Sequence, residues 1–280
     1  MQENFPSNRR KTLTMTRVAW LTDIHLEFLQ PDEVPAFVGH LAEALPDIVL
    51  IGGDTGIALS FASFLQILQT RLKCPIYFVL GNHDFYRGAI AKVRARAEQL
   101  TASEPWLRWL PAQGLVPITS TTGLLGHDSW ADGRFGNGAA SQVELNDYHL
   151  IAEFAGLLRK DRFKQLARLG DEAAAYFRHW LPQACARFKN IILLTHVPPF
   201  REACWHEGKI SDDEHLPHFA CKAVGEVLAS VMKGNPECKL TVLCGHTHSA
   251  GVANILPNLQ VKTGGAEYGH PRVQELMIIE

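Results

Sequence analysis

Five short clusters of aspartate, asparagine and histidine follow directly after apolar runs of the chain. The clusters are TDIH at 22–25, GGD at 52–54, GNHD at 81–84, TH at 195–196 and GHTH at 245–248. Their side chains offer imidazole nitrogens together with carboxylate and amide oxygens, and no thiolate. Such donors suit manganese, iron, zinc or another first-row metal ion rather than an iron–sulfur cluster. The candidate ligands are Asp23, His25, Asp54, Asn82, His196, His246 and His248.

The number and spacing of these donors favour a site for two metal ions. Seven ligands are too many for one ion of this kind, but they suit two ions that share one carboxylate. Residues i and i+2 of an extended segment point the same way, so both members of the D-x-H and H-x-H pairs can face one site. Glycines 52, 53, 81 and 245 permit tight turns close to a metal.

The apolar runs that precede the clusters predict the elements that position them. Continuous rather than alternating hydrophobicity indicates strands that are covered on both faces. Segments with helical spacing between the first three runs indicate a largely parallel sheet. Because parallel strands end at a common edge, the five clusters are expected to form one site. The runs are 18–21, 48–51, 76–80, 191–194 and 240–244, and the helical segments are 33–45, 57–72 and 88–100.

The remaining sequence predicts one large domain over residues 15–280, preceded by a disordered tail at 1–14. Translation could begin at Met1 or at Met15. Short apolar pieces broken by glycine and proline predict a second set of strands over 107–125. Helical spacing from about Ser141 onward predicts a helical insertion at about 141–170, which could add core to one flank or form a lid that restricts substrate size.

Composition indicates a cytoplasmic protein without a membrane partner. The chain has 27 Lys plus Arg against 29 Asp plus Glu, so its net charge of -2 gives no overall attraction to nucleic acid. The 6 cysteines form no CxxC pair, which is typical of a reduced compartment. The sequence shows neither a signal-peptide pattern nor an apolar run long enough to span a bilayer.

The series D-x-H, G-G-D, G-N-H-D, T-H and G-H-T-H resembles the signature of the calcineurin-like binuclear metallophosphoesterases. The similarity extends from Asp23 to His248 and implies a four-layer α/β/β/α sandwich, in which helices flank two packed mixed β-sheets. It also implies two ligand sets that share Asp54 as a bridge. One metal would be held by Asp23, His25, Asp54 and His248, and the other by Asp54, Asn82, His196 and His246.

The same resemblance gives His83 and Asp84 catalytic roles. It implies that His83 contacts the phosphate and protonates the leaving oxygen, while Asp84 orients the His83 ring. An imidazole titrates near neutral pH, as a general acid should. The sequence departs from the family pattern at one point, because Thr-Gly follows Asp54 where bulkier residues are expected. This departure affects the expected shape of the loop but not the bridging role of Asp54.

The predicted function is hydrolysis of a phosphate mono- or diester by attack of a metal-bridging hydroxide. Two ions about 3.5–4 Å apart lower the pKa of a bridging water and bind the phosphoryl oxygens. A small-molecule substrate is favoured because the chain lacks a basic tract with interleaved aromatic residues. The alternatives are a phosphoprotein phosphatase, a nuclease and a non-catalytic metal-binding scaffold protein. Polar loops at 127–138 and 198–215 offer candidate substrate contacts or ordinary solvated residues, namely Arg134, Arg201, Trp205 and His206.

Overall fold

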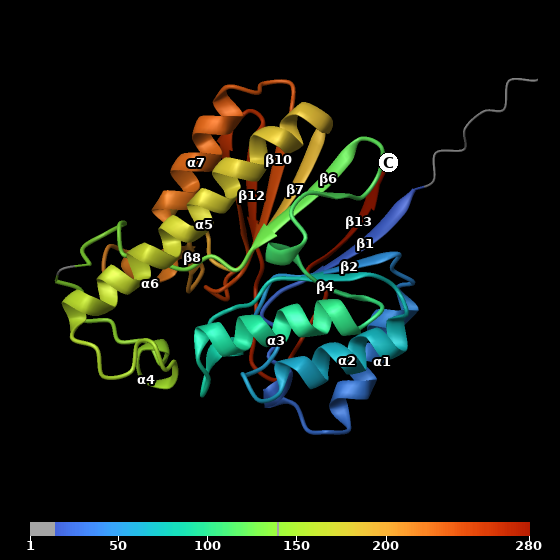
Figure 1. Ribbon diagram of the computed structural model, residues 1–280, viewed down its shortest axis with the longest axis horizontal. Helices are drawn as coiled ribbons and strands as arrows, with labels where there is room; N and C mark the ends of the chain where they lie inside the picture. Colours follow the sequence, from blue (N-terminus) through green and yellow to red (C-terminus); the bar gives the residue numbers. More distant parts are fainter. Residues whose placement is uncertain (1–14, 139) are drawn as a thin grey trace, which may run out of the picture.

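Two β-sheets packed face to face form the centre of the molecule, and helices cover the outer face of each sheet (Figure 1). This computed structural model describes residues 15–138 and 140–280. The sequence prediction of a tail at 1–14 therefore lies outside the described residues. Among the described residues, no helix combines the length and the apolar character needed to cross a membrane.

The first sheet has the order β13-β1-β2-β3-β4, in which β1 to β4 are parallel and β13 runs antiparallel to β1. The helices that connect its parallel strands lie together on its outer face (Figure 1). These elements are β1 Thr16–Leu21, α1 Glu33–Glu43, β2 Ile48–Ile51, α2 Phe61–Leu72, β3 Ile76–Phe78, α3 Ile90–Ser103, β4 Leu107–Trp109 and β13 Glu275–Ile279.

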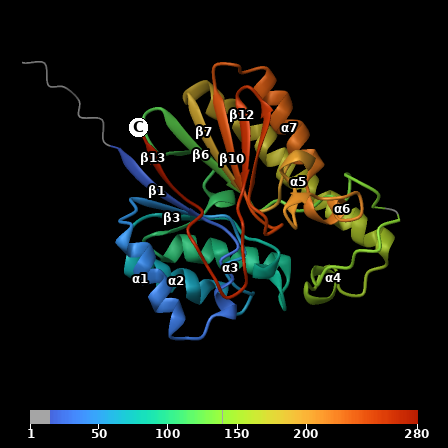
Figure 2. The same cartoon turned by 180° about the vertical axis from the view of Figure 1, so that it is seen from behind.

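The second sheet has the order β11-β12-β10-β7-β6-β5, and its four middle strands are parallel. Two helices, α5 and α7, pack on its outer face (Figure 2). The elements are β5 Val116–Pro117, β6 Thr122–His127, α5 Arg159–Arg187, β7 Asn190–Thr195, α7 Lys222–Lys233, β10 Lys239–Cys244, β11 Gly251–Leu256 and β12 Leu259–Thr263.

Alternation along the strands explains why their sequences are apolar on both faces. In β1, Val18 and Trp20 enter the core between the two sheets, where they join Ile192 and Leu194 of β7. Ala19 and its next-but-one neighbour Leu21 point to the opposite face and pack beneath the helices of the first sheet. The prediction of a four-layer sandwich with two mixed sheets is confirmed.

The segment from Ser141 to α5 contains one short helix, α4 (Asp147–Leu150), followed by turns. The 29-residue α5 begins only at Arg159 and continues to Arg187. Both views show α4 and the first turns of α5 projecting beyond the sheets on the side where α6 lies (Figures 1 and 2). The short elements of this region and of the loops are η1 Leu26–Phe28, η2 His83–Phe85, η3 Leu110–Ala112, η4 Arg201–Ala203, β8 Trp205–His206, β9 Lys209–Ile210 and α6 Leu216–Phe219.

Candidate metal centre

The loops after β1, β2 and β10 bring four candidate ligands into one cluster. One donor atom from each of these side chains lies within 4.8 Å of the other three. Nε2 of His25 lies 3.2 Å from Nε2 of His248, and Nε2 of His248 lies 3.5 Å from Oδ1 of Asp23. The fourth member is Asp54, whose Oδ2 lies 3.7 Å from Nε2 of His25.

The loops after β3, β7 and β10 bring the remaining candidate ligands together beside this cluster. Oδ1 of Asn82 lies 2.9 Å from Nε2 of His196 and 2.9 Å from Nδ1 of His246. Nε2 of His196 is also 3.5 Å from Oδ2 of Asp54. The Asp54 carboxylate therefore lies between the two groups of donors, as a shared ligand must.

The backbone at five of the seven candidate ligands is left-handed rather than extended. The φ angles are 51° at Asp23, 42° at His25, 53° at Asp54, 71° at His246 and 59° at His248. The sequence argument that D-x-H and H-x-H pairs face one site as extended segments is therefore wrong in its geometry. The pairs converge because the chain turns sharply at each ligand, a conformation that is costly for residues other than glycine.

Backbone carbonyls and burial prepare the imidazoles to accept a metal. Nδ1 of His196 lies 2.9 Å from the Gly52 carbonyl, and Nε2 of His246 lies 3.1 Å from the His218 carbonyl, so the other ring nitrogen of each faces the cluster. Burial lowers the pKa of His246 to about 3 and that of His248 to about 4. Neutral imidazoles with a free lone pair fit first-row metal ions.

Charge repulsion is concentrated at Asp54. Burial, together with the carboxylates of Asp23 and Asp84, raises the pKa of Asp54 well above its ordinary value. Burial also acts to raise the pKa of Asp23, but the surrounding imidazoles, His196 foremost, outweigh it and lower that pKa. Bound cations would remove the repulsion, which again fits the donor set to metal ions.

Asp84 has a different environment from the one expected from the sequence. Its Oδ2 accepts the N–H groups of Asp54 and Gly81 at 2.9 Å each, and its Oδ1 accepts those of Thr55 and Gly56. The carboxylate therefore fixes the loop that carries Asp54 instead of orienting the His83 ring. The reason is local, because the chain enters the short helix η2 at His83 and the two neighbouring side chains diverge.

His83 lies at the rim of the cluster, between Glu27 and Tyr86. Oε1 of Glu27 lies 3.6 Å from Nδ1 of His83 and 3.5 Å from Nδ1 of His25. Burial acts to raise the pKa of Glu27, but the contacts with these two imidazoles outweigh it and lower the pKa to about 2. The His83 ring also stacks on Tyr86, with the ring centroids 4.2 Å apart. Glu27 is therefore the carboxylate that faces His83.

The candidate substrate residues of the 198–215 loop lie in and beside the β8–β9 hairpin. The ring of His206 is 5.0 Å from that of Phe219, which is 5.5 Å from the metal-ligand candidate His246. The indole of Trp205 packs against Gly251 at the start of β11. Arg201 is ion-paired with Asp213 at 2.8 Å. Of the three, His206 has this aromatic link to the cluster.

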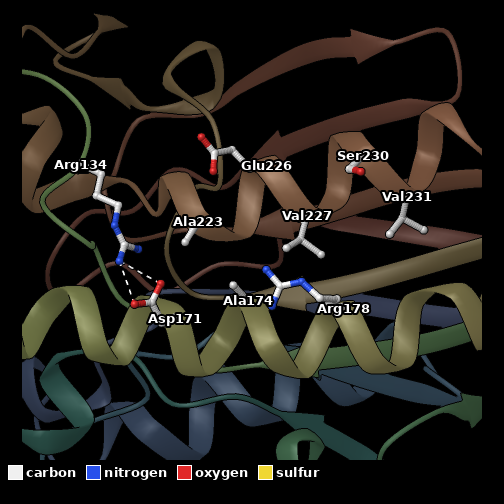
Figure 3. A pocket seen from close by; sticks show the side chains of 9 residues that line it. All are labelled: Arg134, Asp171, Ala174, Arg178, Ala223, Glu226, Val227, Ser230 and Val231. Atoms are coloured by element: carbon white, nitrogen blue, oxygen red, sulfur yellow. Dashed lines mark hydrogen bonds and ion pairs between the residues drawn. The ribbon is translucent and has the colours of Figure 1, made fainter.

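Arg134, the fourth candidate, lines a pocket between α5 and α7 with a volume of about 530 Å³. Its guanidinium donates to Asp132 at 3.1 Å and to Asp171 at 2.8 Å, and Figure 3 shows it directed at Asp171. None of the residues lining this pocket is a candidate metal ligand. The structure therefore uses Arg134 to pair carboxylates beside α5.

Several residues at the site carried no motif in the sequence. Glu27, Tyr86 and Asp147 contact site residues directly. Phe28 and Tyr268 have ring centroids 4.5 Å apart and are about half exposed, and Tyr268 is 4.7 Å from the ring of His25. The sequence offered two signals: Glu27 and Phe28 lie in the same loop as the D-x-H pair, and Tyr268 lies in the stretch GGAEYGHPR at 264–272, which could line the rim of the site.

Gly81 provides a test of how closely the loops fit. A Cβ atom at Gly81 would lie 2.6 Å from the Asp54 amide nitrogen and 2.6 Å from Cε1 of His196. We expect Gly81→Ala to lower kcat by about 10²-fold, because a displacement of about 1 Å can have that effect at a catalytic site. Gly39→Ala is the control, since a Cβ there meets nothing within 4 Å. Wild-type turnover by Gly81→Ala would contradict the close fit.

A two-sheet sandwich with oxygen and imidazole donors converging at one end of its strands defines a metal-dependent hydrolase. The family model of the calcineurin-like phosphoesterases matches residues 16–250, and the chain belongs to that family. Membership makes the protein a hydrolase of phosphoric ester bonds with a dimetal centre, as the resemblance of the sequence motifs implied. Among curated proteins, none matches the chain.

Two solved structures show the same fold. Phosphopantetheinyl hydrolase from Mycobacterium tuberculosis is similar with a TM-score of 0.66 and 14% identity, over 91% of this chain and 90% of that chain. A dimetal phosphatase from Danio rerio is similar with a TM-score of 0.54 and 12% identity, over 91% of this chain and 89% of that chain. At these identities the likeness concerns the fold.

Proposed function

We propose that the protein hydrolyses a phosphate mono- or diester of a small molecule, with His83 as general acid. The observation that supports this most is the convergence of the seven candidate donors beside His83, whose ring is 4.5 Å from that of His25. One ion would be held by Asp23, His25, Asp54 and His248, and the other by Asp54, Asn82, His196 and His246.

Manganese, iron and zinc are the ions that this donor set suits best. Two such ions lower the pKa of a bound water and stabilise charge on the phosphoryl oxygens. Protonation of the leaving group and orientation of the proton donor depend on side chains of the protein. Nδ1 of His83 faces the ionised Glu27, so the proton for the leaving oxygen would be held at Nε2. Tyr86 limits rotation of the His83 ring by stacking on it.

A small organic substrate is supported by the surroundings of the centre. The net charge of -2 gives no general attraction to a polyanion. The exposed rings of Phe28 and Tyr268 lie beside His25 and offer an apolar surface to the part of the substrate next to the phosphate. His206, Trp205 and Arg201 would contact the substrate from the side of the β8–β9 hairpin.

The test is hydrolysis of p-nitrophenyl phosphate and bis(p-nitrophenyl) phosphate by metal-free protein reconstituted with Mn²⁺. We expect turnover only in the presence of the ion, and the ratio of the two rates shows which ester type is preferred. Reloading after chelation should restore the rate. A protein that binds two Mn²⁺ ions but turns over neither of these substrates nor a panel of natural phosphate esters would instead be a non-catalytic scaffold.

A further inference from the structure

The segment that carries α4 makes a polar contact with the metal centre through one carboxylate. Oδ1 of Asp147 accepts a hydrogen bond from Nδ2 of Asn82 at 2.9 Å and another from the hydroxyl of Tyr86 at 2.6 Å. Asp147 is only 5% exposed. This contact spans 65 residues of sequence and joins the segment before α5 to the loop after β3.

The contact decides which end of the Asn82 amide faces the metal centre. The amide has an oxygen that can ligate a metal and an NH₂ group that cannot, and the two ends have nearly the same shape. An ionised carboxylate accepts hydrogen bonds and donates none. Asp147 therefore selects the rotamer in which Nδ2 points toward α4 and Oδ1 points at the imidazoles of His196 and His246.

The same carboxylate oxygen also fixes the ring that supports His83. The hydroxyl of Tyr86 is anchored on Asp147, and the Tyr86 ring stacks on His83 with an interplanar angle of 27°. Burial, followed by the charge of Asp147, raises the pKa of Tyr86 above its ordinary value, which keeps the hydroxyl a donor.

The segment is docked firmly enough to hold Asp147 in place. The Arg87 N–H donates to the Leu150 carbonyl at 2.7 Å, and the Ala152 N–H donates to the Gly88 carbonyl at 3.0 Å. Tyr148, next to Asp147, is almost completely buried and belongs to the core beneath the first sheet. These bonds tie the segment to the residues immediately after Tyr86.

We infer that Asp147 is a positioning residue that orients Asn82 as a metal ligand and, through Tyr86, the His83 ring. The segment that carries α4 thus supports residues of the metal centre through Asp147, and a role as a lid over the centre is not its only possible function. The inference rests on the proposed roles of Asn82 and His83.

The experiment measures binding of Mn²⁺ to metal-free protein by titration calorimetry. Asp147→Ala should weaken one of the two sites by about 10–100-fold, the effect typical of losing the partner of a metal ligand, and leave the other site unchanged. Asp147→Asn keeps the size of the side chain, but its amide can donate as well as accept, so it no longer selects the Asn82 rotamer and should weaken the same site. Asp147→Glu keeps a group that only accepts hydrogen bonds, so it should bind Mn²⁺ at that site more tightly than Asp147→Ala does.

Tyr86→Phe removes the hydroxyl that Asp147 anchors and keeps the 2.9 Å hydrogen bond from Asn82 to Asp147, while Asn82 loses only its longer contact of 3.3 Å with that hydroxyl. It should retain both Mn²⁺ sites and lower kcat with little change in KM, because the His83 support loses its anchor. Glu153→Gln is the control, since this carboxylate of the same segment accepts the Ile90 N–H at 2.9 Å and makes no contact with the centre. It should match wild type in both measurements.

The outcomes separate this inference from the proposed function. Wild-type affinity in Asp147→Ala would overturn the role of Asp147 while leaving the two-metal centre intact. If Asp147→Ala does not fold, wild-type affinity of both sites in Asp147→Asn would overturn it equally, because an acceptor that cannot donate would then not be needed. Failure of the wild-type protein to bind two Mn²⁺ ions would contradict the proposed function itself.

Discussion

Replacing His83 with alanine should reduce kcat by about 10²–10⁴-fold for an alkyl phosphate ester, which is the usual contribution of a general acid. The loss should be much smaller for p-nitrophenyl phosphate, because nitrophenolate leaves readily without a proton. The comparison therefore reports on the protonation step itself. It requires kcat for both substrates, measured with the metal-loaded variant and with wild type.

Metal content distinguishes this role from a structural one. Donor atoms of His25, Glu27 and His83 also lie within 4.8 Å of one another, so His83 could instead serve as a ligand. If His83 is a general acid, His83→Ala should keep both ions. If His83 is a ligand, His83→Ala should lose at least one of them. His40→Ala, on the exposed face of α1, is the control and should behave as wild type. Equal losses for both leaving groups would contradict proton transfer by His83.

Replacing Asp54 with asparagine should lower kcat by about 10³-fold or more and also remove at least one ion. Oδ2 of Asp54 lies 3.7 Å from Nε2 of His25 and 3.5 Å from Nε2 of His196, one imidazole from each donor group. An amide supplies neither the charge nor a second metal-binding oxygen. Several kcal/mol of charge stabilisation correspond to about this change in rate.

Without metal, the Asp54→Asn variant should be at least as stable as the wild-type protein, although it is the less active of the two. Because the folded-state pKa of Asp54 is raised, the carboxyl stabilises the fold while protonated, and this contribution is lost as the pH rises through that pKa. Asparagine remains neutral, so metal-free Asp54→Asn should melt at or above the temperature of metal-free wild type at neutral pH. Asp161→Asn, exposed on α5, is the control. A markedly lower melting temperature in Asp54→Asn would assign the lost activity to misfolding.

The strands and the location of the site could be predicted from the sequence because both depend on local patterns. Apolar runs such as 48–51 form strands with both faces buried, as in β2. The polar clusters meet because the parallel strands of each sheet end at a common edge and the edges of the two packed sheets adjoin, as the contact of His196 with Asn82 shows. The residue at which α5 begins could not be predicted from the sequence. The residues from Ser141 to Leu158 have helical spacing, but they form mainly turns around α4.

The supporting contacts could not be predicted because they depend on where the chain turns. Asp84 is adjacent to His83 in sequence, yet its oxygens accept N–H groups from the loop after β2. Glu27 faces His83 although 56 residues separate them, and Asp147 reaches Asn82 from a segment without any recognisable motif. Such pairs become visible only when the loops have been placed in space.

The left-handed backbone at the metal ligands implies a trade-off between stability and activity. Each such conformation costs a non-glycine residue about 1 kcal/mol or more, and five of the ligand residues adopt it. Glycine at one of these positions would relieve the strain but remove the donor. A homologous protein that no longer uses the centre would gain folding stability by replacing these ligands. A protein that keeps the centre depends on bound metal to offset the strain.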